Sequence, residues 1–253
     1  MMGTETAAMA TTFDLSGLGS FVATFARVGA FARSAPLIGD RIVSTKVRIG
    51  VVVMVAMALT TTRAPLSFDA LPALLPGEIL LGLLMGFAVR LVFAGAETGG
   101  QLIGLTMGLG FAAAYDPMQE DESLPTRRIG YCLGGLAFLT AGGLEHSVRA
   151  LAVAAPDMST LAGGMRTVIS RGGEVLVLAV RVAAPVLIAG IIVNVGAGLA
   201  SRAAPALNVF SITFALVILV CGAVLIATAP GMVRDIGAIA LRAMRILDEV
   251  ARP

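Results

Sequence analysis

Apolar runs with few or no charged residues recur from one end of this sequence to the other. An α-helix needs about 20 mostly apolar residues to cross the roughly 30 Å hydrocarbon core of a bilayer. Val209–Ala229 meets this requirement without a charged residue, and six further runs approach it: Phe21–Ile38, Ile49–Thr60, Glu78–Ala96, Gly99–Ala114, Ile129–Ala141 and Glu174–Leu199. Because a helix satisfies its own backbone hydrogen bonds in lipid, we expect an all-α membrane protein.

The composition supports this expectation. Of 253 residues, 57% are hydrophobic and only 13% are charged, with a mean hydropathy of +0.93, whereas soluble domains carry about 25% charged residues. No basic patch interleaved with aromatic residues is present, which argues against nucleic-acid binding. Cys132 and Cys221 lie in apolar runs, where we expect free thiols rather than a disulfide.

Polar side chains interrupt the apolar runs, and we treat them as candidate intramembrane residues: Arg27, Arg90, Glu97, Gln101, Arg181, Asn194 and Asn208. A charge at the bilayer centre costs about 2.5–3.5 kcal/mol on insertion scales. The three arginines can form structural ion pairs with Glu78, Glu97 or Glu174, which is the interpretation that we favour. Alternatively, their helices line an aqueous path.

The distribution of charge predicts the orientation and the organisation of the chain. Basic residues at Arg41, Lys46, Arg48 and in the C-terminal stretch favour the cytoplasm. Residues 1–20 contain no Lys or Arg, so we expect no cleaved signal and a periplasmic N-terminal segment. Residues 21–229 then form the helical membrane domain, with five crossings. Residues 230–253 have the spacing of a cytoplasmic amphipathic helix, suited to a membrane surface or a partner.

Glycines mark two kinds of site between residues 82 and 117. Gly82 and Gly86, and likewise Gly100 and Gly104, are four residues apart, a spacing that lets helices approach closely in membranes.

The stretch Met107, Gly108, Leu109, Gly110 and Phe111 is different, because glycines two apart do not share a helix face. We expect the helix to break here, before Asp116 and Pro117 end the segment. Irregular backbone at membrane depth survives only against protein or a cavity. This stretch is therefore a candidate re-entrant loop or plug, whose flexible Met and bulky Phe could seal a pore.

Signatures of catalysis are absent from the sequence. We find no zinc-protease motif, no phosphate-binding loop and no Gly-x-Ser-x-Gly. His146 is the single histidine, and a metal site needs more ligands. We therefore expect no enzyme activity, cofactor or metal. The main rival function is a small-solute secondary transporter, which also has broken helices and intramembrane charges, although no convincing internal repeat is present. A membrane-embedded enzyme and an isolated binding subunit are weaker rivals.

Three stretches together resemble the FliR/SctT family of type III secretion export-gate proteins, with a weaker likeness in the tail: Arg27–Gly50, Gly77–Pro117 and Arg181–Leu216. The resemblance implies fused FliP-like and FliQ-like helical hairpins, packed beside FliP and FliQ in the inner membrane and contacted by FlhB. It also implies a plug loop, Gly104–Tyr115, and passage of unfolded flagellar proteins. An injectisome gate is the alternative. Thr106 and Ala206 depart from glutamines common in the family, while Asn208 fits its pattern as a helix cap.

Overall fold

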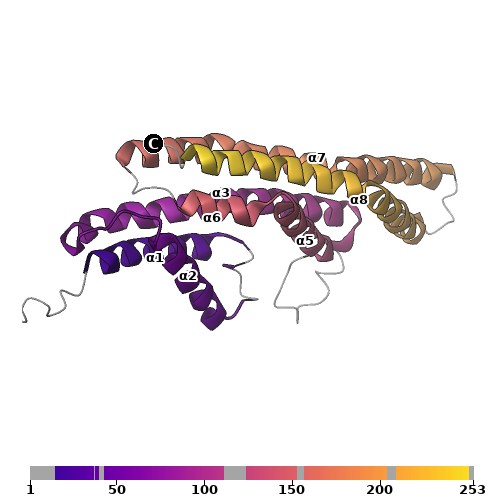
Figure 1. Ribbon diagram of the computed structural model, residues 1–253. Helices are drawn as coiled ribbons and strands as arrows, with labels where there is room; N and C mark the ends of the chain where they lie inside the picture. The colour runs from indigo at the N-terminus through magenta and orange to yellow at the C-terminus, as the bar shows by residue number, and fades with distance from the viewer. Residues whose placement is uncertain are drawn as a thin grey trace, which may run out of the picture. The chain divides into compact units, whose positions relative to one another are not determined.

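A computed structural model describes residues 15–36, 38–39, 43–110, 124–152, 157–203 and 209–250 of the chain (Figure 1). Within these ranges the regular structure is entirely helical. The elements in chain order are α1 (Leu15–Ser34), α2 (Thr45–Thr60), the short 3₁₀ helix η1 (Phe68–Ala70), α3 (Leu71–Thr106), α5 (Pro125–Thr140), α6 (Gly143–Leu151), α7 (Met158–Ala203) and α8 (Val209–Val250). The expected all-α fold is confirmed for the described residues.

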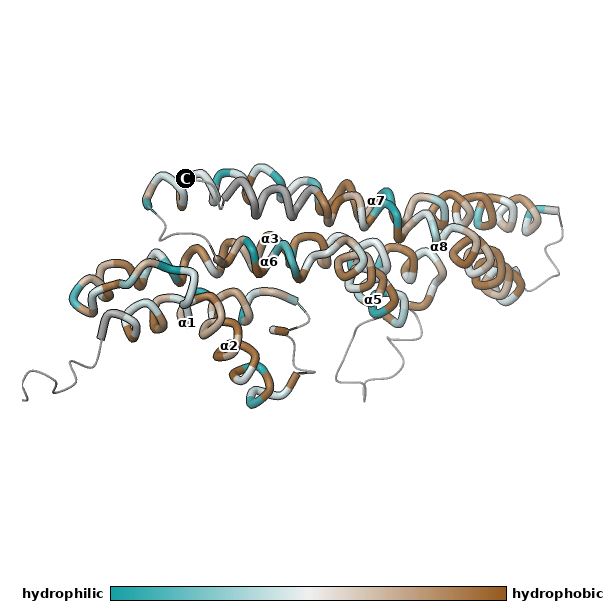
Figure 2. The backbone as a smooth tube through the Cα atoms, viewed as in Figure 1, coloured by the Kyte–Doolittle hydropathy of each residue, from teal (hydrophilic) through white to brown (hydrophobic). Residues whose placement is uncertain are grey.

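Three of the described helices are long and apolar enough to cross a membrane: Phe68–Thr106, Met158–Arg202 and Ser211–Leu241. Only 11% of the most apolar stretch of the last of these is buried inside the chain, against 56% for the first. Figure 2 shows the corresponding concentration of hydrophobic residues in the N-terminal half of α8. So much uncovered apolar surface requires lipid or other protein around it.

The helices are longer than the apolar runs of the sequence. The runs Glu78–Ala96 and Gly99–Ala114 are not separate helices, because α3 passes through the first and into the second without a break. α8 likewise continues through Pro230, where the sequence suggests a boundary between membrane domain and tail. A proline costs a helix one backbone hydrogen bond, and membrane helices tolerate this when neighbouring groups compensate.

The described residues divide into two compact units. The first contains the chain up to Ala88, Glu145–Val168 and the end of α8 from Ile246. Here α1 packs against α2 and the N-terminal half of α3, around the fully buried Leu81 and Met85.

The second unit contains Val89–Leu144 and Ile169–Arg245. In it, the C-terminal half of α3 packs against α5, α7 and α8, and the ring of Phe93 lies tilted against the rings of Tyr131 and Phe138. Gly95 faces Leu178 and Gly99 faces Val182, so α3 and α7 run in the same direction.

Candidate functional site

The C-terminal end of α3 is the first part of the candidate site. The N–H of Met107 donates to the Ile103 carbonyl at 3.0 Å, and the N–H of Gly108 donates to the Leu105 carbonyl at 3.0 Å. Gly108 has a φ of 74°, in the left-handed region that favours glycine. The helix therefore stops at Thr106, inside an apolar stretch, and glycine is the residue that allows the chain to change direction there.

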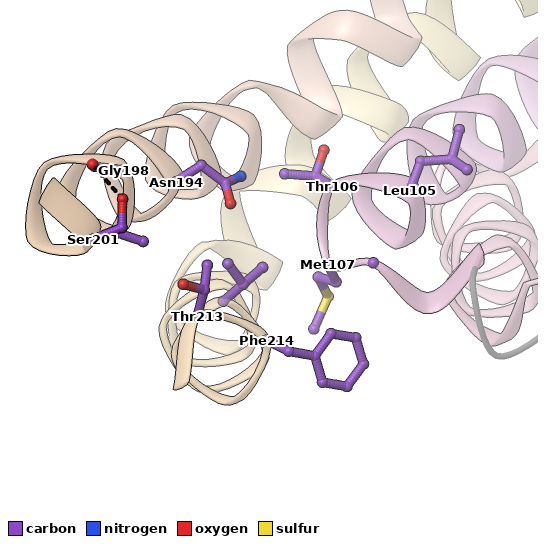
Figure 3. A pocket seen from close by; sticks show the side chains of 11 residues that line it. Leu105, Thr106, Met107, Asn194, Gly198, Ser201, Thr213 and Phe214 are labelled. Carbon is purple, nitrogen blue, oxygen red and sulfur yellow. Dashed lines mark hydrogen bonds between the residues drawn. The ribbon is translucent and has the colours of Figure 1, made fainter. Parts of the chain in front are cut away.

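A cavity of about 480 Å³ lies beside this helix end, between α3, α7 and α8. Figure 3 shows Asn194 projecting from α7 toward Thr106, and Met107 lying next to Phe214 of α8. The complete lining is Leu105, Thr106, Met107, Gly108, Asn194, Ala197, Gly198, Ser201, Thr213, Phe214 and Val217.

The end of α3 packs against small residues of α7 and α8. The Thr106 methyl group lies so close to Gly190 that a Cβ at this glycine would collide with it. Met107 is only 7% exposed, and its Cε would be 3.9 Å from a Cβ at Gly222. Nearby, the thiol of Cys221 on α8 donates a hydrogen bond to the Val186 carbonyl of α7 at 3.8 Å. The helix end is therefore held between two helices before the chain turns.

The polar groups around the cavity differ in their availability. Thr106 Oγ1 donates to the Leu102 carbonyl at 2.8 Å, and Ser201 Oγ donates to the Gly198 carbonyl at 2.8 Å, so both serve their own helices. Asn194 is exposed, and the described part of the chain contains no hydrogen bond of its side chain. Asn194 is thus a polar group that the cavity can offer to an occupant.

The predicted plug residues are only partly described. Met107, Gly108, Leu109 and Gly110 follow the end of α3, with Met107 buried and the other three half-buried. Phe111, Asp116, Pro117 and Asn208, also singled out from the sequence, lie outside the described residues. The role of this stretch as a plug stays a prediction.

The four glycines at the predicted packing positions all lie against neighbouring backbone or side chains. A Cβ at Gly82 would collide with the Arg27 carbonyl, and one at Gly86 with the Ser34 hydroxyl, both on α1. A Cβ at Gly100 or Gly104 would collide with Thr126 at the start of α5. α3 therefore approaches two different helices closely through its two glycine pairs.

A buried ion cluster lies in the first unit. Nε of Arg27 is 2.5 Å from Oε2 of Glu78, and Nη2 of Arg63 is 3.1 Å from Oε1 of the same carboxylate. Arg27 also donates to the Leu151 carbonyl at 3.1 Å, and Arg63 to the Thr24 hydroxyl at 3.1 Å. The structural ion pair that we favoured for Arg27 is therefore confirmed, and its carboxylate is Glu78.

The same interpretation is wrong for the other two arginines. Glu97 pairs with Arg127 of α5 at 3.0 Å, and Glu174 pairs with Arg171 one turn earlier at 2.6 Å. Arg90 and Arg181 are exposed, and neither forms an ion pair within the described ranges. The carboxylates expected for them have closer partners. Gln101 is exposed as well.

Most of the sequence matches a known protein family. Residues 18–242 match the family described as bacterial export proteins, family 1. The chain belongs to this family of bacterial export proteins. The flagellar biosynthetic protein FliR of Escherichia coli (strain K12) is 30% identical over 228 residues, which cover 85% of this chain and 86% of that protein. The FliR of Caulobacter vibrioides is 29% identical over 202 residues, covering 74% and 78%. The Yop proteins translocation protein T of Yersinia pestis is 31% identical over 140 residues, covering 53% and 54%.

In this bacterial export protein, sequence reasoning missed three partners of the predicted charged residues. Arg63 and the Leu151 carbonyl join the buried cluster from segments far from Arg27, and Arg127 holds Glu97. Arg63 lies in the segment between α2 and η1. No sequence pattern marks it as a partner of Glu78.

Proposed function

We propose that this chain is a subunit of the flagellar type III protein-export gate in the bacterial inner membrane. In this role it helps to form and seal the channel through which unfolded flagellar proteins leave the cell. The observation that carries the proposal is the family match over residues 18–242, together with relatives named flagellar biosynthetic protein FliR that align along most of the chain. The long apolar helices suit a membrane subunit.

The end of α3 suits a seal. A pore wide enough for an unfolded polypeptide would leak ions when idle, so it needs an apolar, deformable closure. Met107 supplies a flexible side chain at the point where the helix stops, and Gly108 supplies the turn. We propose that Met107–Phe111 forms this closure and that it acts without catalysis.

The partners follow from the same proposal. We infer that FliP and FliQ pack beside this chain in the gate, and that FlhB contacts the assembled gate. The proposed orientation places the N-terminus in the periplasm and the C-terminus, with its arginines, in the cytoplasm. Residues 1–20, 21–229 and 230–253 are the corresponding periplasmic, membrane and cytoplasmic parts.

An injectisome export gate is the second candidate, because relatives with names from that class also align. The alignment with the translocation protein T of Yersinia pestis covers only 53% of this chain, whereas that with the Escherichia coli FliR covers 85%. The difference in coverage favours the flagellar assignment.

Deletion of the gene tests the assignment directly. We expect viable cells without filaments or motility, flagellar proteins retained inside the cell, and recovery of motility from a plasmid copy. A motile deletion strain would contradict the flagellar role. Affinity purification in mild detergent should also recover several small membrane proteins with this chain, whereas a solute transporter should purify alone.

The seal has its own test. Removing Gly108–Phe111 should raise the ion conductance of cells that express the complete gate, compared with removal of the four residues 120–123 as a control. Both variants must still co-purify with the partner subunits. Equal conductance in the two would reject the seal while leaving the assignment to the export gate intact.

A further inference from the structure

The outer face of α7 carries large apolar side chains with an arginine at each end. Ile188, Ile191, Ile192, Val195 and Leu199 are each between 58% and 66% exposed. Their spacing of three and four residues places them on one side of the helix. Arg181 and Arg202 continue this spacing at the two ends and are also exposed.

The distance between the two arginines matches the thickness of a bilayer. They are 21 positions apart in one continuous helix, which at 1.5 Å per residue is about 30 Å. The residues between them, 182–201, include no charged side chain. The hydrocarbon core of a bilayer is about 30 Å thick, so both guanidinium groups can reach phosphate while the residues between remain in hydrocarbon.

The type of side chain on this face favours lipid over a partner helix. Helix interfaces inside membranes are enriched in small residues that allow close approach, as at the glycines of α3. The outer face of α7 instead presents isoleucine, valine and leucine. The two polar residues of the same stretch, Asn194 and Ser201, both line the cavity beside α3, and Asn194 points toward α3 (Figure 3).

α8 extends the same surface. It lies against α7 through Cys221 and Val186, and its own outward residues Leu219 and Ile226 are 69% and 78% exposed. Its uncharged stretch ends at the exposed Arg234. The two helices together therefore offer a broad apolar surface with arginines beyond its margins.

We propose that the outer face of α7 is a phospholipid-binding surface, in which Arg181 and Arg202 bind phosphate groups in opposite leaflets. A guanidinium binds phosphate through two parallel hydrogen bonds, and the long arginine stem lets the charge reach the headgroups. This explains why Arg181 has no ion pair among the described residues. The proposal rests on the membrane location proposed above and is independent of the export role.

Depth measurements on the complete gate test the placement. Single spin labels at Ile188, Ile191, Val195 and Leu199, in a Cys132→Ser, Cys221→Ala background, are compared in phosphatidylglycerol and phosphatidylcholine vesicles by accessibility to oxygen and to a water-soluble nickel chelate. The greatest depth should lie at Ile191, midway between the arginines. Arg181→Leu should shift it by about one turn toward residue 181, and Arg181→Lys should leave it in place. High nickel accessibility, or protection from both reagents by a partner subunit, would overturn the proposal.

Bound lipid provides the second measurement. In native mass spectrometry of the purified gate, Arg181→Gln and Arg202→Gln should each lose tightly held phospholipid, whereas Arg166→Gln, an exposed arginine of α7 outside the uncharged stretch, should not. Unchanged lipid retention in the first two variants would overturn the phosphate contacts. The export function is tested by motility and not by lipid retention. The two proposals can therefore fail separately.

Discussion

Arg27 and Glu78 form an ion pair that is almost completely removed from solvent, with side chains 0% and 1% exposed. The pair joins α1 to α3, and Arg63 adds a second guanidinium to the same carboxylate. A cavity of about 270 Å³, lined in part by Arg63 and Glu78, lies beside it. Burial of charge is costly and breaking such a pair is costlier still, because the remaining charge stays buried. The first unit therefore depends on one carboxylate.

Glu78→Gln should destabilise the protein strongly, since it removes the charge that faces both Arg27 and Arg63. Loss of one member of a buried pair costs about 3–5 kcal/mol, so the thermal unfolding midpoint of the detergent-purified chain should fall. Glu145→Gln is the matched control, because the Glu145–Arg149 pair is 66–71% exposed and such pairs contribute about 0–1 kcal/mol. Equal midpoints in the two variants would contradict the structural role of the cluster.

Gly100 and Gly104 should respond differently to alanine, although both face Thr126. At Gly100 the new Cβ would meet the Thr126 backbone carbonyl, whereas at Gly104 it would meet the Thr126 hydroxyl. Each substitution should cost about 1–3 kcal/mol through overpacking. Adding Thr126→Ala should restore much of the stability lost in Gly104→Ala and little of that lost in Gly100→Ala.

Thr126→Ala alone should be nearly neutral, because its buried hydroxyl has no hydrogen-bond partner among the described residues and its removal leaves no donor unpaired. Chemical unfolding of the three single and two double variants measures the coupling. Equal rescue at both glycines would show that the close approach of α3 and α5 is placed incorrectly.

Local features of the sequence predicted the helical class and the break near Gly108, because hydropathy and glycine spacing act within a few turns. The lengths of the helices were harder to predict. α3 begins at Leu71 and passes through Pro76 before it reaches the predicted run at Glu78, and α7 begins at Met158, well before the predicted run at Glu174. Tertiary packing along a long helix outweighs one missing hydrogen bond, and packing is not visible in local sequence.

Ion pairing was predictable only in part. Glu78 pairs with Arg27 across 51 positions, but Glu97 and Glu174 pair with Arg127 and Arg171 instead. The choice depends on which helices become neighbours. The cavity beside Met107 is equally invisible in sequence, because three helices from separate parts of the chain form its lining.

Gly108→Ala should weaken the turn after α3, because an L-residue in the left-handed region costs about 1–2 kcal/mol. Gly108→Asn should cost less, since asparagine tolerates this conformation. Gly196→Ala is the control: this glycine is helical and a Cβ there meets nothing within 4 Å, so alanine should stabilise by up to about 1 kcal/mol. Unfolding in detergent measures the stability of each variant, and swarming on soft agar measures its export function. A neutral Gly108→Ala variant would contradict the observed turn.

Asp157 immediately precedes α7 and gives the protein a pH-dependent contact outside the apolar span. Its carboxylate accepts hydrogen bonds from the Thr160 hydroxyl and amide and from the Ser159 hydroxyl, and these bonds lower its pKa to about 2. The folded pKa is below the usual value of about 3.9. The stabilisation is therefore complete above about pH 4 and is lost as the pH falls toward 2.

The difference in stability between the wild type and Asp157→Ala should accordingly be constant from pH 8 to pH 5 and shrink below pH 4. Thr160→Ala should raise the pKa of Asp157, because it removes the hydroxyl that contributes most to the shift. Carbon-13 NMR of the labelled carboxyl group follows this titration directly, with the Asp157→Ala variant identifying its signal. A carboxyl that titrates near pH 4 in the wild type would mean that the helix cap is not formed in solution.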